Sequence, residues 1–414
     1  MSERKVPKIR FPGFTGDWEE RSFSDLTFPS GRRNTENLDL VPYAITNENG
    51  FIPQKDAHDD FGYMKNVDRR AYNIVHPKSF AYNPARINVG SLGYYTGTED
   101  VIVSSLYEVF STVDKINDRF LWHWFKSNAF LKWINKLQEG SVRLYFYYDK
   151  LCECKIHVPS LEEQQKIAKC LDDIDQRIFE SERELDKMKE LKKGMLQKML
   201  PKEGESVPEI RFPGFTDSWK LRKLSATKTF FTDGNYGEAY PKASDMTDSS
   251  EGIPFLTGSN LKDGRLDITG VNYITKDKHV KLTSGHLEED DIVIAVRGSL
   301  GTLGYVNKEN VGWNINSQLA ILRTDKSELC GKFLLQFLLS GVGQNELLKR
   351  QTGSALKQLP IGAIKEVDVP ITSILEQQRI GEFFSNLDSF IILQKRECDK
   401  WQTLKKALLQ QMFV

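Results

Sequence analysis

The chain carries the stretch VPKIRFPGFTGDW at residues 6–18 and repeats it as VPEIRFPGFTDSW at residues 207–219. The two copies differ at three of thirteen positions, although about half of the protein separates them. The repeats of solenoid proteins are short and recur about every 20–50 residues. A repeat that recurs after about half of this chain is the length of a whole domain. We therefore expect one folding unit to occur twice in tandem.

Three shorter matches extend the repeat along both halves of the chain. They are GSLG at residues 90–93 and 298–301, QEGS at 138–141 with QTGS at 351–354, and EQQKI at 163–167 with EQQRI at 376–380. The ends of the two units match closely and their interiors match weakly. This pattern is typical of one fold that does the same kind of work on two different targets.

The composition is that of a globular protein with a balanced charge. The chain has 414 residues, of which 57 are basic and 57 acidic. A DNA-binding protein usually has a basic excess, because phosphate contacts dominate its affinity. If this chain binds DNA, its basic residues must cluster locally, or a partner must supply part of the attraction. The sequence lacks a run of about 18 apolar residues and a signal-peptide core, which predicts a cytoplasmic protein.

Each repeat divides into a strand-rich part and a helical part, so the predicted fold class is α+β. The strand-rich parts, residues 1–157 and 207–370, mix short apolar runs with Gly, Asn and Asp turns and a few short helices. The helical parts are residues 158–206, which include a linker, and residues 371–414. We expect each helical part to form one long helix of about 60 Å.

Apolar residues in both helical parts recur in 4-3-4 steps, the spacing of a coiled-coil seam. For the second helix to bury its seam against the first, it must run antiparallel, which gives the molecule pseudo-twofold symmetry. The predicted seam residues are Ile167, Leu171, Ile174, Ile178, Leu185 and Met188 in the first helix and Ile380, Phe384, Leu387, Ile391 and Trp401 in the second. The pattern continues through Leu191 and Leu404.

The repeated opening stretch has the residues of an anchor rather than of a binding site. Its aromatic side chains can dock the start of each domain, and antiparallel helices would bring both helix ends close to it. The anchoring residues that we expect are Phe11, Phe14 and Trp18 in the first copy and Phe212, Phe215 and Trp219 in the second.

Motifs of catalysis and cofactor binding are missing from the sequence. It has neither a G-x-x-x-x-G-K-[ST] phosphate loop nor a G-x-G-x-x-G fingerprint after a strand. The five cysteines and six histidines have no metal-ligand spacing. We therefore expect no catalytic residue, no metal and no cofactor, which excludes a free-standing nuclease or methyltransferase.

Several segments have residues suited to reading a DNA duplex. Arg and Lys bind guanine edges, Asn and Gln bind adenine edges, and Gly and Ser let the backbone approach phosphates. The segments are RINVGSLGYY at 86–95, EGSVRLYFYYDK at 139–150, VRGSLGT at 296–302, WNINSQ at 313–318 and TGSALKQL at 352–359.

Taken together, these features resemble the DNA-specificity subunit of type I restriction–modification systems, the HsdS family. The paired opening stretches, YNPARINVGSLG, DIVIAVRGSLGTLG, and the EQQ segments that start the helices carry this resemblance. It implies two target-recognition domains, 1–157 and 207–370, that each read one half of an asymmetric split DNA target. It also implies that the antiparallel helices fix the gap between the halves, and that the subunit itself is non-catalytic. The implied partners are double-stranded DNA, two adenine-methyltransferase subunits and ATP-dependent restriction–translocation subunits.

The residues that lie in matching family segments are those we expect to face DNA, although each could instead have a structural role. They are Arg86, Asn88, Ser91, Ser141 and Arg143 in the first domain and Arg297, Ser299, Asn316, Ser354 and Lys357 in the second. The spacing around Arg86 differs from that around Arg297, so their equivalence is left open. A second hypothesis is a coiled-coil scaffold that assembles partners other than DNA.

Overall fold

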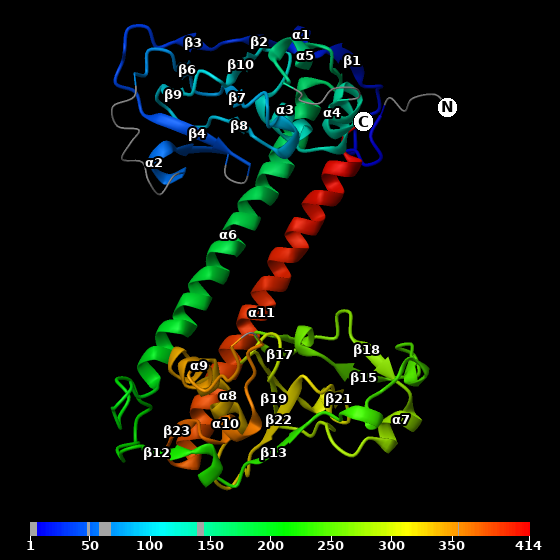
Figure 1. Cartoon of the computed structure of the whole chain (residues 1–414). Coiled ribbons are helices and arrows are strands. Elements are labelled where there is room, and N and C mark those ends of the chain that lie inside the picture. The colour runs from blue at the N-terminus through cyan, green and yellow to red at the C-terminus, as the bar shows by residue number, and fades with distance from the viewer. Residues whose placement is uncertain (1–5, 48–49, 58–67, 139–144, 355) are drawn as a thin grey trace. The chain divides into compact units, whose positions relative to one another are not determined.

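The computed structural model describes residues 6–47, 50–57, 68–138, 145–354 and 356–414 (Figure 1). The chain forms two compact units. Unit 1 comprises residues 1–182 and 396–414, and unit 2 comprises residues 183–395. Each unit therefore contains one strand-rich domain and a part of each long helix. No helix in the described part of the chain has the length and apolarity that a membrane crossing requires.

Unit 1 is built on two sheets and a short ribbon. A four-stranded antiparallel sheet has the order β2 (Thr27–Pro29), β10 (Glu108–Thr112), β7 (Phe80–Tyr82), β8 (Leu92–Tyr94). A five-stranded sheet has the order β3 (Arg32–Arg33), β6 (Asn73–Val75), β9 (Val101–Val103), β4 (Pro42–Thr46), β5 (Gly50–Pro53), and β1 (Glu19–Ser22) pairs with β11 (Lys155–Val158). The short helices are α1 (Phe23–Leu26), α2 (Gln54–Ala57), η2 (Ile87–Val89), α3 (Asp118–Phe125), α4 (Asn128–Gln138) and α5 (Tyr148–Cys152).

Unit 2 repeats this plan with a larger sheet. Its six strands have the order β13 (Phe230–Asp233), β22 (Leu319–Arg323), β19 (Ile292–Ala295), β20 (Leu303–Tyr305), β17 (Gly264–Leu266), β16 (Leu261–Lys262). A second sheet has the order β14 (Met246–Thr247), β18 (Asn272–Ile274), β15 (Ile253–Leu256), β21 (Asn314–Ile315), and β12 (Lys220–Lys223) pairs with β23 (Asp368–Ile371). The α-helices are α7 (Lys276–Lys281), α8 (Gly331–Leu339), α9 (Gly341–Leu348) and α10 (Ile361–Lys365), and 3-10 turns lie at Leu224–Ala226, Gly237–Ala239, Ala243–Asp245, Gly258–Asn260 and Lys308–Asn310.

The strand register corrects one of the sequence matches. Leu92 of β8 pairs with β7 as Leu303 of β20 pairs with β19, and both strands read Leu-Gly-Tyr. The segment GSLGY at residues 90–94 therefore corresponds to GTLGY at 301–305, and the GSLG match at 298–301 was wrong. On this register Arg86 and Arg297 both precede the tyrosine of their strand by eight residues, which makes them structurally equivalent.

The two long helices are α6 (Leu161–Met199) and α11 (Ile374–Gln411), which Figure 1 draws in green and in orange to red. In unit 1, Lys405 of α11 forms an ion pair with Asp175 of α6, and Gln402 Nε2 donates to Glu182 Oε1 at 2.8 Å. Contacts that advance along α6 thus move backward along α11, so the helices run antiparallel. The predicted α+β fold class is confirmed.

Unit 2 contains the equivalent ion pair with the two helices exchanged. Here Lys192 lies on α6 and Asp388 on α11, with 2.6 Å between Nζ and Oδ1. The two lysines are 213 residues apart, as are the two aspartates. The lysine is on α11 in unit 1 and on α6 in unit 2. Pseudo-twofold symmetry requires this exchange, because it relates α6 of one unit to α11 of the other.

The helix seam differs from the prediction near these ion pairs. Leu191 is 55% exposed and Leu404 is 41% exposed, so neither side chain is buried in a helix contact. Lys192 and Lys405, the next residues, are largely buried instead, and each extends its ammonium to an aspartate of the other helix. A lysine can occupy such a position because its alkyl stem packs against apolar neighbours while its charge finds a partner.

The first residues of each predicted seam pack against the adjoining domain. Ile167 and Leu171 of α6 lie in the same apolar core as Trp18, and Ile380 and Phe384 of α11 lie in the same core as Trp219. Each long helix is therefore rooted in the core of the domain that precedes it.

The repeated opening stretches are anchors, as predicted. Arg10 binds the buried carboxylate of Glu163 through two hydrogen bonds of 2.6 and 2.8 Å, and Arg211 binds Glu376 with the same two distances. Both carboxylates belong to the first turn of a long helix. Because a buried carboxylate is costly unless it is paired, each arginine fixes its stretch to one helix start.

Backbone hydrogen bonds attach the same stretches to the last turn of the other helix. The N–H of Ile9 donates to the carbonyl of Gln411 at 3.0 Å, and the N–H of Ile210 donates to the carbonyl of Lys198 at 2.8 Å. Each stretch thus joins the start of one long helix to the end of the other within its own unit. This explains why the same residues are needed twice.

Candidate nucleic-acid interface

In unit 2, the residues expected to face DNA gather at one end of the six-stranded sheet. Asp233, the last residue of β13, pairs with Ala320 of β22, and Ala295, the last residue of β19, pairs with Leu319. The segments that leave β13 and β19 and the segment that enters β22 must therefore meet at this end. We call it the reading edge of unit 2.

Arg297 is held in place at this edge by three neighbours. Its Nη1 donates to the carbonyl of Ser317 at 3.3 Å, and its Nε donates to Gln358 Oε1 at 3.4 Å. Its guanidinium lies 5.3 Å from the ring centroid of Tyr236, whose hydroxyl donates to the same Ser317 carbonyl at 3.0 Å. The guanidinium has five N–H donors, so donors remain to bind a guanine edge or a phosphate.

A tight loop carrying Ser354 and Lys357 lies next to Arg297. Thr352 and Gln358 close the loop by exchanging two backbone hydrogen bonds of 2.9 Å. Gly353 has φ +88°, and a Cβ there would lie 2.4 Å from the carbonyl oxygen of Leu356, so only glycine fits. The side chains of Ser354 and Lys357 are exposed, as is Ser299 in the connection between β19 and β20.

Asn316 and Ser91 lie inside the domains and have structural contacts. Asn316 is 4% exposed, and its Oδ1 accepts the N–H of Gln318 at 3.0 Å, which shapes the turn before β22. Ser91 is 3% exposed and donates to the carbonyl of Ile45 at 3.2 Å. Gln318, two residues after Asn316, has an exposed amide side chain at this edge.

Unit 1 has an equivalent reading edge, where the connection between β7 and β8 carries Arg86 and Asn88, both exposed. The N–H of Phe146 donates to the carbonyl of Pro84 at 2.8 Å, just as the N–H of Leu359 donates to Val296 at 3.0 Å in unit 2. The segment after each QxGS motif therefore docks beside the same connection in both units. Ser141 and Arg143 fall outside the described residues.

Both reading edges contain residues that the sequence analysis did not select. Arg33 follows β2 in unit 1, and its Nη1 donates to the carbonyls of Ala71 at 2.5 Å and Ser105 at 3.4 Å. Tyr236 follows β13 in unit 2 and lies beside Arg297. Tyr145 and Tyr147 stack with 5.7 Å between ring centroids and are half-exposed, which suits contact with sugars or bases. Strand pairing brings Arg33 and Tyr236 to the edges, so local motifs gave no signal for them, whereas Tyr145 and Tyr147 lie in the segment 139–150 that the sequence had indicated.

One histidine–carboxylate group in the described residues has the geometry of a metal site. His123, Asp172 and Asp175 each place a ligand atom within 4.8 Å of the others. However, Asp172 already binds Arg119 and His123, and Asp175 binds Lys405. Burial opposes ionisation of Asp172, but the hydrogen bonds from His123 and Arg119 prevail and lower its pKa to about 2. The carboxylates are thus neutralised by side chains of the protein, and the cluster joins α3 to α6.

Comparison with known proteins identifies the family. Residues 17–192 and 234–400, which make up most of the chain, match the type I restriction modification DNA specificity domain. The chain belongs to this family. Among curated type I specificity subunits it is similar to the putative MjaX subunit of Methanocaldococcus jannaschii, with 24% identity over 98% of this chain and 95% of that protein. It is also similar to the EcoBI subunit of Escherichia coli, with 22% identity over 72% of this chain and 66% of that protein.

Solved structures of type I specificity subunits share the fold. The S subunit from M. genitalium aligns over 99% of both chains with a TM-score of 0.65 and 17% identity. A chain from a study of complex assembly and conformational transition of a type I system aligns over 97% of this chain and 98% of that chain, with a TM-score of 0.52 and 18% identity. The two-domain, two-helix architecture is therefore that of known type I specificity subunits.

Proposed function

We propose that this specificity subunit reads an asymmetric, bipartite DNA target, with each domain reading one half. The recognition domains that we propose are residues 1–157 and 207–370. The observation that supports this most directly is the pair of equivalent reading edges with different side chains. At matched described positions, Arg86 of unit 1 corresponds to Arg297 of unit 2, but Asn88 corresponds to Ser299. Arg33 in unit 1 and Tyr236 and Gln318 in unit 2 add further unequal side chains. Unit 2 also exposes Ser354 and Lys357, whose counterparts in unit 1 fall outside the described residues. Equivalent frames with unequal contact residues suit two unequal half-sites.

In this proposal, α6 and α11 set the gap between the half-sites. Each helix is continuous over more than 35 residues and is fixed at both ends by the anchors described above. A helix has a defined rise per residue, so a helix of fixed length is a suitable spacer. A change in helix length should therefore change the gap without changing either half-site.

We propose that catalysis comes from partners and that the subunit is itself non-catalytic and without a cofactor. The partners are two adenine-methyltransferase subunits and ATP-dependent restriction–translocation subunits, acting in the cytoplasm.

Two grooves, of about 820 Å³ in unit 2 and about 450 Å³ in unit 1, support the binding of two copies of one partner. They are lined by residues 213 positions apart: Lys192, Lys193, Leu196, Asp388 and Ile391, and Lys405, Lys406, Leu409, Asp175 and Ile178. Like surfaces that repeat by symmetry bind like partners.

Long-read mapping of methylated adenine tests the proposal in cells with and without this gene. We expect one bipartite motif with a fixed gap, lost on deletion and restored by the intact chain. Methylation that is unchanged by deletion would contradict the proposal.

The scaffold hypothesis is tested by measuring duplex binding in the presence of the methyltransferase. A scaffold without DNA contacts would show no salt-sensitive, sequence-specific binding.

A further inference from the structure

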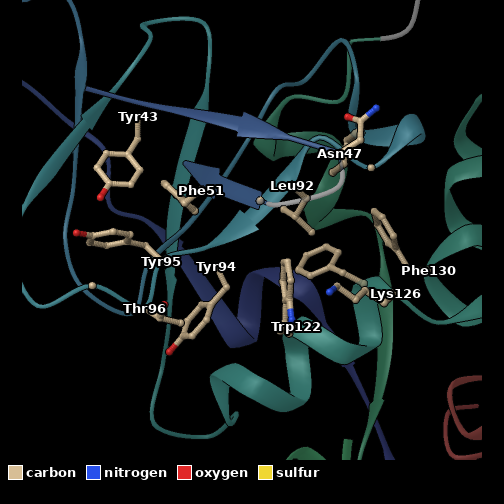
Figure 2. Close-up of a pocket in the computed structure, with 15 residues that line it drawn as sticks. Tyr43, Asn47, Phe51, Leu92, Tyr94, Tyr95, Thr96, Trp122, Lys126 and Phe130 are labelled. Carbon is tan, nitrogen blue, oxygen red and sulfur yellow. The ribbon is translucent and has the colours of Figure 1, made fainter. Parts of the chain in front are cut away.

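Unit 1 contains an aromatic pocket of about 740 Å³ (Figure 2). It lies between β8 with the β4–β5 strands on one side and α3 with the start of α4 on the other. A volume of this size is typical of small-molecule sites, which hold a few polar groups among apolar walls. The aromatic rings in its wall are those of Tyr43, Phe51, Tyr94, Tyr95, Trp122, Phe125 and Phe130.

The corresponding place in unit 2 is filled by the protein itself. There β17 pairs with β20, and a Cβ on Gly264 would lie 2.9 Å from Leu339 of α8. The equivalents of Leu335 and Leu339 are Trp122 of α3 and Lys126, the residue that follows α3, and both line the pocket. In the described part of unit 1, β8 ends its sheet, and β5 contacts it without strand pairing. The pocket is thus a difference between two copies of one fold.

The pocket has the polarity expected of a nucleotide site. Lys126 is the charged side chain in its described lining, and its ammonium lies 4.0 Å from the ring centroid of Trp122. The amide of Asn47 and the hydroxyl of Thr96 add hydrogen-bonding groups. Flat aromatic surfaces stack on bases of any identity, and a lysine beside them attracts a phosphate.

The pocket also adjoins the reading edge of unit 1. Its wall includes Ile87 and Gly90, which belong to the same connection as Arg86 and Asn88. A ligand in the pocket would therefore contact the segment that carries the proposed DNA-binding residues.

We propose that this pocket binds a single nucleotide, with its base among the aromatic rings and its phosphate at the Lys126 ammonium. The nucleotide is either free or an unstacked nucleotide of DNA bound at the reading edge. The second source rests on the proposed function, whereas the first is independent of it.

The test uses the full chain and 2-aminopurine deoxyribonucleoside monophosphate, whose fluorescence falls when its base stacks on an aromatic ring. We expect saturable quenching by the intact protein. Trp122→Leu and Lys126→Leu, which introduce the residues of unit 2, should each weaken binding about tenfold. Lys126→Leu should weaken binding of the monophosphate more than that of the nucleoside, whereas Trp122→Leu should weaken both equally.

The control is Lys132→Met, which removes an exposed lysine of α4 outside the pocket and should leave affinity unchanged. Lys126 follows α3 and has an exposed side chain, so we expect its replacement to leave the fold intact even if that of Trp122 does not. Quenching that is absent, or that survives both substitutions in folded protein, would overturn the proposal.

A DNA duplex with one unpaired 2-aminopurine distinguishes the two sources of the nucleotide. Competition by free deoxyadenosine monophosphate at low concentration indicates that the ligand is a free nucleotide. Quenching only in the bound duplex indicates an unstacked nucleotide of DNA.

Discussion

The two units share the contacts that hold the long helices and differ in the contacts that can reach a ligand. The arginine–glutamate anchors, the interhelical lysine–aspartate pairs and the backbone bonds to the helix ends occur in both units with nearly equal geometry. The reading edges carry different side chains, and the Trp122 and Lys126 side chains that line the aromatic pocket of unit 1 are replaced by leucines in unit 2. The difference separates the part of the fold that sets geometry from the part that sets specificity, and the following predictions test this separation.

The largest effect is expected from breaking an anchor. Arg211→Met leaves the carboxylate of Glu376 buried without a charge partner, which costs about 3–5 kcal/mol. We expect the urea midpoint of unit 2 to fall, and Arg10→Met to do the same to unit 1. Lys223→Met, which removes an exposed ion pair with Glu366, is the control and should leave the urea midpoint nearly unchanged, because solvent screens exposed ion pairs. Equal losses from Arg211→Met and the control would mean that the anchors do not hold the helices.

The next effect concerns the reading edges. Arg297→Ala should weaken binding of the complex by about 1–3 kcal/mol if the guanidinium reads a base, and only at targets with the correct second half-site. Arg86→Ala should have the matching effect at the first half-site, because the two arginines are equivalent. Competition binding with each half-site altered in turn measures both. A loss that is the same for every DNA sequence would assign the arginine to a phosphate instead.

A smaller effect is expected from Tyr236→Phe. This change keeps the ring beside Arg297 and removes the hydrogen bond to the Ser317 carbonyl, which contributes about 0.5–1.5 kcal/mol. We expect a similar loss of affinity for the second half-site and no change at the first. Unaltered binding would show that Arg297 does not depend on this neighbour for its position.

The smallest effect is a change in pH dependence confined to unit 1. Burial lowers the pKa of His123, although the hydrogen bond to Asp172 opposes the shift. The unfolded chain then takes up the proton first, so stability is lost as the pH falls below the ordinary histidine pKa of about 6.5. His123→Gln introduces the residue found at the equivalent position of unit 2, Gln336, and should flatten the dependence of the unfolding midpoint of unit 1 on pH below about 6.5. An unchanged slope would exclude His123 as its source.

The features that the sequence predicted well are those carried by residues close together in the chain. The duplicated anchor, the two long helices and their antiparallel direction follow from local identity and periodicity. Beyond Met188 the periodicity was misleading, because an ion-paired lysine can take a seam position in place of Leu191.

The reading edges were predicted only in part, because strand pairing assembles them. Arg33 and Tyr236 reach these edges from segments distant in sequence, which no local motif indicates. Ser91 and Asn316 have the right chemistry for DNA, but Ser91 bonds to the carbonyl of Ile45 and Asn316 to the turn before β22, so both side chains lie inside their domains. The equivalence of Arg86 and Arg297 depended on a strand register that the GSLG match had obscured.

The most direct test of the central claim is to map methylated adenine in cells whose subunit carries residues 1–157 in place of 207–370. If each domain reads its own half-site and the helices alone set the gap, the new target consists of the first half-site twice, in inverted orientation, with a gap close to the original. Methylation that still follows the original asymmetric motif, or a first half-site that changes, would contradict this account.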